Sequence, residues 1–86
     1  MVDVVEIHTQ GRGDADQWIT QYKLQYSNDG LTWYTVNQGA LFSANYDRNS
    51  IVANVLATPI RCSAIRILPA SWYNFYGMRS EVYITD

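Results

Sequence analysis

The feature that most constrains this chain is its alternation of apolar and polar residues, because successive side chains of a strand point to opposite faces of a sheet. WITQYKLQYS, residues 18–27, is the clearest such run, and VDVVEIHTQ at 2–10 alternates more loosely. No window keeps an apolar repeat of helical period over three turns. The chain is therefore predicted to be all-β, with strands at 2–10, 18–27, 31–36, 50–56, 59–69 and 78–85.

Turn sequences separate these strands at intervals typical of an antiparallel sandwich or barrel. NDG at 28–30 predicts a tight hairpin before LTWYTV, and NQG at 37–39 predicts a second turn. SANYDRNS, residues 43–50, reads as a polar corner. No linker or repeat interrupts the sequence, so residues 1–86 form a single domain.

Charge and cysteine content exclude several classes of protein. The net charge is −2 and the six basic residues are scattered, which argues against a nucleic-acid partner. Cys62 is the only cysteine, so no disulfide forms within the chain. The first ten residues carry Asp3 and Glu6 and predict neither a signal peptide nor a membrane span. The localisation is left open.

Catalytic and metal chemistry are not indicated by the titratable residues. His8 is the only histidine, lies in the middle of a strand, and accompanies no sequence typical of a nucleophile, so no enzyme is predicted. A zinc site needs more His and Cys ligands than one of each. Asp14 and Asp16 could hold calcium with loop carbonyls, but their spacing matches no known calcium loop. No cofactor is predicted, and calcium stays a weak alternative.

Aromatic residues allow both a structural and a ligand-binding interpretation. SNDGLTW, residues 27–33, approaches the Asp-box of sialidase-like propellers but is one residue short, so a hairpin with Trp33 in the core is favoured. Trp72, Tyr73, Phe75 and Tyr76 cluster in PASWYNFYGMR, where exposed rings could stack on sugars. The favoured prediction places Trp72 in the core and leaves Tyr73 and Tyr76 outside.

Arg12-Gly13-Asp14 is the tripeptide that integrins read on adhesion proteins. Three-letter matches arise often by chance, so an integrin partner is not favoured. The glycines at 11 and 13 permit a turn there, and Arg12 is expected to pair with a local carboxylate.

Several stretches, in order, resemble the discoidin family, also called the coagulation factor five/eight C-type domain. IHTQGRGDADQWITQYKLQYSNDGLTWYTV looks like its middle segment, SANYDRNSIVANVL like its corner and next strand, and PIRCSAIRILPASWYNFYGMRSEVY like its closing block. The loop GRGDADQW makes the slime-mould discoidin lectins the most similar members. This resemblance implies a jelly-roll β-sandwich of the galactose-binding-like type, with a core formed by Trp18, Trp33, Trp72, Arg79 and Glu81.

The resemblance also implies a ligand-binding end, where loops of the sandwich converge on a cell-surface glycan of the galactose type. Its candidate residues here are Arg12, Asp14, Asp16, Phe42, Asn45 and Tyr46. Family members that bind phosphatidylserine carry exposed apolar residues at the loop tips. The acidic tip of this loop disfavours lipid binding unless Phe42 and Tyr46 act as a membrane wedge.

The resemblance covers little more than the C-terminal half of the family domain. A sandwich lacking part of one sheet leaves apolar faces and an unpaired edge exposed, which favours pairing with another chain. The sequence therefore predicts a truncated sandwich completed by oligomerisation, most simply as a two-fold homodimer. An alternative to the lectin is then a self-associating half-domain whose main property is folding by dimerisation.

Overall fold

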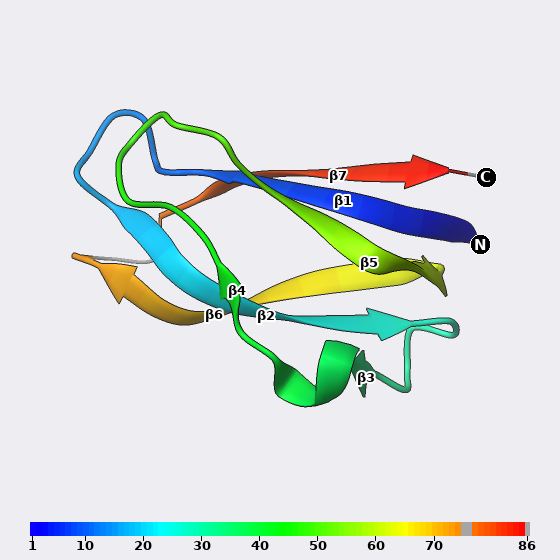
Figure 1. The fold of residues 1–86 in the computed structure, drawn as a ribbon. Coiled ribbons are helices and arrows are strands. Elements are labelled where there is room, and N and C mark those ends of the chain that lie inside the picture. The colour runs from blue at the N-terminus through cyan, green and yellow to red at the C-terminus, as the bar shows by residue number, and fades with distance from the viewer. Residues whose placement is uncertain (75–76, 86) are drawn as a thin grey trace.

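The structure, a computed structural model, consists of two antiparallel sheets that face each other (Figure 1). It describes residues 1–74 and 77–85, so the expectations for Phe75 and Tyr76 lie outside the described residues. Its elements are β1 (Val2–Gln10), β2 (Trp18–Ser27), β3 (Tyr34–Thr35), the 3-10 helix η1 (Val36–Gly39), β4 (Phe42–Ser43), β5 (Val52–Cys62), β6 (Ala64–Tyr73) and β7 (Arg79–Thr85).

The first sheet has the strand order β5-β1-β7, and the second is built around β2. In the second sheet β6 pairs with β2 along its length, while the short strands β3 and β4 also pair with β2. Every pairing is antiparallel. The predicted all-β antiparallel sandwich is confirmed.

The core lies between the sheets and comes mainly from the two central strands. Val4 and Ile7 of β1 and Ile19, Tyr22 and Leu24 of β2 are almost completely buried. Val4 and Ile7 are an odd number of residues apart, yet both point inward. The register of β1 shifts between Val4 and Glu6 on both of its neighbours, and an extra residue at such a bulge reverses the later side chains. This bulge explains why the alternation of residues 2–10 looks loose.

Three predicted strands differ from the observed ones, and the strand expected at 50–56 continues to Cys62 as β5. The run 59–69 is not one strand, because the chain turns at Ser63, whose backbone N–H and hydroxyl both donate to the Ser27 carbonyl at 3.0 and 3.1 Å. The strand expected at 31–36 is only Tyr34–Thr35. There the Asp29 carboxylate accepts the N–H groups of Leu31 and Thr32, each at 2.8 Å, and holds them in the turn.

The tryptophans predicted for the core lie at its margins. Trp33 is only half-buried and lies under the Arg66 guanidinium, 4.0 Å from the ring centroid. Trp72 is 49% exposed at the end of β6, so its predicted burial is wrong. Trp18 is half-buried and stacks on Tyr73 with ring centroids 4.6 Å apart. None of the three rings belongs to the buried core, and alternation alone does not reveal this.

Candidate functional site

Residues 11–17, residues 44–51 and the start of β7 converge at one end of the sandwich, at the left of Figure 1. We call this region the loop end. The loop 11–17 connects the two central strands β1 and β2, so its position is fixed by both sheets. Within it, Arg12 N–H donates to the Gln17 carbonyl at 2.9 Å, and Gln17 N–H donates to the Ala15 carbonyl at 2.8 Å.

Arg79 joins these segments from the first position of β7. Its Nε donates to the Gly11 carbonyl at 2.9 Å, and its Nη2 donates to the Arg48 carbonyl and to Asn49 Oδ1, both at 3.0 Å. Arg79 is exposed, so its predicted place in the core is wrong. Its role is nevertheless structural, because one guanidinium satisfies acceptors from both loops.

Opposite charges meet in pairs on the surface of the loop end. Arg12 Nε lies 2.9 Å from Asp14 Oδ1, and Arg12 Nη1 donates to Gln17 Oε1 at 3.1 Å. Arg48 Nε lies 2.7 Å from Asp16 Oδ1, and this carboxylate raises the pKa of Arg48. The predicted residues Arg12, Asp14 and Asp16 are thus brought together, with Arg48 added. Its part could not be read from the sequence, since Arg48 lies 32 residues from Asp16.

These carboxylates face arginines rather than each other. Among residues 1–74 and 77–85, no three His, Cys, Asp or Glu side chains are grouped so as to hold a metal ion. The same part of the chain contains no helix long and apolar enough to cross a membrane. The chemistry of the loop end is that of exposed donors and acceptors whose charges cancel in pairs.

Asn45 does not contribute to the exposed surface of the loop end. It is only 2% exposed, and its Nδ2 donates to the carbonyls of Thr9 and Ser50 at 2.9 and 2.8 Å. This prediction is corrected, since a buried amide bonded to the backbone ties the corner to β1 and cannot contact a ligand. The adjacent Tyr46 is 70% exposed, and its ligand-binding role stays a prediction.

Phe42 lies away from the loop end as well. Its ring stacks on buried Tyr22, with centroids 5.5 Å apart and an interplanar angle of 13°, and packs against the core. It lines an apolar groove of about 240 Å³ together with Val36, Leu56 and Ile60. Phe42 is therefore a packing residue, and its predicted ligand-binding role is corrected. It does not form with Tyr46 the exposed wedge that lipid binding would have required.

Asp47 shapes the corner through its carboxylate. Oδ1 accepts the N–H groups of Asn49 and Ser50 at 3.1 and 2.8 Å, and Oδ2 accepts the Ser50 hydroxyl at 2.6 Å. The Ser50 hydroxyl, followed by the backbone N–H groups, lowers the pKa of Asp47 below 3.8. These bonds favour the charged form, because a protonated carboxyl is a weaker acceptor.

We expect acid to loosen this corner. Since the pKa of Asp47 is lowered in the folded state, its stabilising effect is complete above 3.8 and is lost as the pH falls through the folded value. A carboxyl-carbon NMR titration should give a midpoint for Asp47 below 3.8. Asp47→Asn should remove the corresponding part of the acid dependence of unfolding. A midpoint at or above the ordinary value would contradict this.

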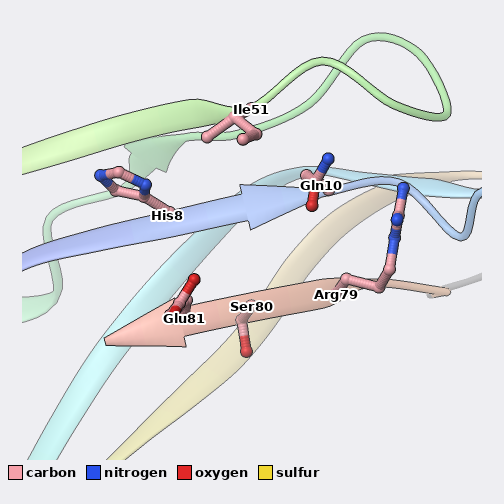
Figure 2. A pocket seen from close by; sticks show the side chains of 6 residues that line it. All are labelled: His8, Gln10, Ile51, Arg79, Ser80 and Glu81. Carbon is pink, nitrogen blue, oxygen red and sulfur yellow. The ribbon is translucent and has the colours of Figure 1, made fainter. Parts of the chain in front are cut away.

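A shallow pocket of about 70 Å³ lies beside the loop end, on the outer face of β1 and β7 (Figure 2). Its Glu81 is exposed, so the predicted place of Glu81 in the core is wrong. His8 is half-buried on this face, and its Nε2 lies 2.7 Å from Glu6 Oε1. The pairing of β1 with β7 brings His8 and Glu81 together, although they lie far apart in the sequence. The lining residues are His8, Gln10, Ile51, Arg79, Ser80 and Glu81.

Comparison with known proteins agrees with the fold and identifies the family. The F5/8 type C domain family matches residues 1–82. Discoidin-2 of Dictyostelium discoideum is 47% identical over 79 residues, which are 92% of this chain and 31% of that protein. Human retinoschisin is 41% identical over 81 residues, 88% of this chain and 36% of that protein. The structure of wild-type discoidin II from Dictyostelium discoideum superposes with a TM-score of 0.92 at 44% identity, covering 96% of this chain and 32% of that one. The chain thus spans about a third of the length of these relatives.

Proposed function

The chain belongs to the F5/8 type C domain family, and on that premise we propose that it is a non-enzymatic module that binds galactose-type cell-surface glycans at the loop end. The observation that carries this proposal is the set of exposed, oppositely charged pairs, Arg12 with Asp14 and Arg48 with Asp16. Each sugar hydroxyl both donates and accepts a hydrogen bond. Carboxylates and guanidinium groups side by side can satisfy both functions.

The charge balance favours a neutral ligand over an anionic one. The charges of the two ion pairs cancel locally, so these groups give the loop end no excess positive charge to attract anionic headgroups. Phosphatidylserine binding is therefore disfavoured, all the more since Phe42 lies away from the tip. If the protein pelleted with phosphatidylserine vesicles but not with neutral vesicles, the preference for a neutral ligand over an anionic one would be refuted.

We expect Arg12→Ala to abolish retention on a galactose resin. Removing one charged hydrogen-bonding group costs about 1.5 to 3 kcal/mol, which weakens binding by about tenfold to a hundredfold. Arg61→Ala is the matched control, because Arg61 is also exposed and pairs with Asp3 at 3.3 Å on the strands β5 and β1. It should be retained like the wild type.

Failure of the wild-type chain to bind any galactose-type ligand, under conditions where it is folded, would refute the lectin proposal. The behaviour of Arg12→Ala in a cell-adhesion assay tests the alternative that an integrin binds the chain. If Arg12→Ala lost cell adhesion but kept its affinity for galactose, the Arg12-Gly13-Asp14 tripeptide would be read directly by an adhesion receptor.

A second candidate function is self-association, favoured by an uncovered part of the inner faces. Trp72 pairs with buried Ile19 in the register of β6 and β2, and Ile84 pairs with buried Val4 in that of β7 and β1. Directly paired residues share a face of a sheet, so both side chains point inward. They are nevertheless 49% and 50% exposed.

The strands that carry them lie on the same side of the sandwich, with Trp72 near the loop end and Ile84 near the opposite end. Asn54 of β5 donates to the Ser43 carbonyl of β4 at 2.8 Å, which closes the side formed by β5 and β4. The strands β6 and β7 form the other side, where each is the last strand of its sheet. We call this the open side. A second copy related by two-fold symmetry would bury it and pair its strand edges.

A further inference from the structure

The pocket beside the loop end is built from paired positions on the outer face of the first sheet. His8 pairs with Glu81, and Gln10 pairs with Arg79, so these four side chains share one face. Figure 2 shows Ile51 above β1 and the side chain of Glu81 pointing from β7 toward β1, whereas that of Ser80 points the other way. Arg79 and Gln10 also bond to the backbone of the loops, whereas His8 and Glu81 bond within their own strands.

Several polar atoms of this pocket have unused hydrogen-bonding capacity among the residues that the structure describes. Arg79 donates from Nε and Nη2, which leaves Nη1. Gln10 donates from Nε2 to the Asn49 carbonyl at 2.8 Å, which leaves Oε1 as an acceptor. Glu81 accepts the Tyr83 hydroxyl on Oε2 at 3.2 Å, which leaves Oε1. The pocket therefore offers one strong donor and two acceptors.

The composition of the lining indicates the class of ligand. Arg79 and Glu81 carry opposite charges, so the pocket attracts neither cations nor anions as a whole. Ile51 is 60% exposed and adds an apolar wall beside these polar groups. A neutral polyhydroxylated ring fits this combination, because its hydroxyls can bond to Arg79 and Glu81 while its C–H face packs on Ile51.

Arg79 connects this pocket to the loop end. The guanidinium that contributes to the pocket also bonds to the carbonyls of Gly11 and Arg48. We propose that the pocket is a second subsite, which binds the hydroxyl edge of the next sugar unit of a glycan held at the loop end. This inference rests on the proposed function. The volume of about 70 Å³ suits one edge of a ring, so the subsite adds affinity to the first site.

The test compares a monosaccharide, methyl β-galactoside, with the disaccharide lactose. Dissociation constants come from calorimetry, and amide chemical shifts of residues 8, 10 and 79–81 report on the pocket. The wild-type chain should bind lactose about tenfold more tightly, as expected for one further charge-assisted hydrogen bond. Glu81→Gln should remove this preference and leave the affinity for methyl β-galactoside unchanged.

Two further variants keep the test specific. Asp3→Asn neutralises a carboxylate on the same sheet, opposite Thr85 and away from the pocket, and should keep the preference for lactose. Ile51→Ala removes the apolar wall of the pocket and should reduce the preference, so it serves if Glu81→Gln does not fold.

The results separate the two proposals. If the wild type binds neither sugar, the glycan-binding function and the subsite are both refuted. If both sugars bind and Arg12→Ala abolishes binding, but Glu81→Gln and Ile51→Ala leave the ratio of affinities unchanged, only the subsite is refuted. If glycine shifts the amides of the pocket and lactose does not, the pocket binds a zwitterion, and the inference of a sugar subsite is wrong.

Discussion

Gly11→Ala is expected to destabilise the folded chain by about 2 to 3 kcal/mol and to abolish retention on a galactose resin. A Cβ at this buried position would lie 2.7 Å from Arg48 Cα and 2.9 Å from the Arg48 carbonyl oxygen, and closer still to the Asp47 carbonyl oxygen. All of these are backbone atoms, so no side-chain rotation can relieve the overlap. The corner would have to move away from the loop 11–17, and the acceptors of Arg79 would separate.

Urea denaturation of both proteins measures the effect, and Gly30→Ala is the matched control. Gly30 has a φ of +77° and no atom within 4 Å of an added Cβ. Its replacement should therefore cost only the backbone penalty of the left-handed region, about 1 kcal/mol, and leave galactose binding intact. A Gly11→Ala chain whose free energy of unfolding stays within about 0.5 kcal/mol of the wild type would contradict the close approach of the two segments.

The elements that could be predicted from the sequence are those fixed by local alternation. The strands at 2–10 and 18–27 were predicted with their observed bounds, because polar and apolar residues alternate there between glycine and asparagine turns. The break at Ser63 was missed because nothing local marks it. It depends on hydrogen bonds to Ser27, which lies 36 residues earlier.

In the candidate site, too, the local sequence predicts some features, and others depend on residues far apart in the chain. The loop 11–17 was singled out by its resemblance to the discoidin lectins. The membership of this chain in the F5/8 type C domain family is confirmed. The roles of its individual residues could not be predicted from the sequence. Asn45 looks like a ligand-binding amide in the sequence, but tertiary packing buries it against Thr9 and Ser50. Glu81 looks structural, but the pairing of β7 with β1 places it in an open pocket.

Ile84→Glu is expected to abolish self-association of the chain. In the proposed homodimer the open side of one copy covers that of the other, so an apolar side chain at this position is removed from water. A carboxylate buried there without a partner makes the free energy of dimerisation less favourable by about 2 kcal/mol or more. The dimer dissociation constant then rises by about thirtyfold or more. Leu31→Glu is the matched control, because Leu31 is 87% exposed at the tip of the turn after β2.

Sedimentation and thermal unfolding at several protein concentrations provide the measurement. Folding coupled to dimerisation makes the Tm of the wild-type chain rise with concentration, since only the folded state binds a second copy. The Leu31→Glu chain should show the same rise, whereas Ile84→Glu should give a Tm that is low and independent of concentration. A wild-type chain that sediments as a folded monomer at micromolar concentration would refute self-association. The half-exposed inner faces at Trp72 and Ile84 would then be tolerated in water by a chain that buries only about 60 to 65% of its unfolded surface.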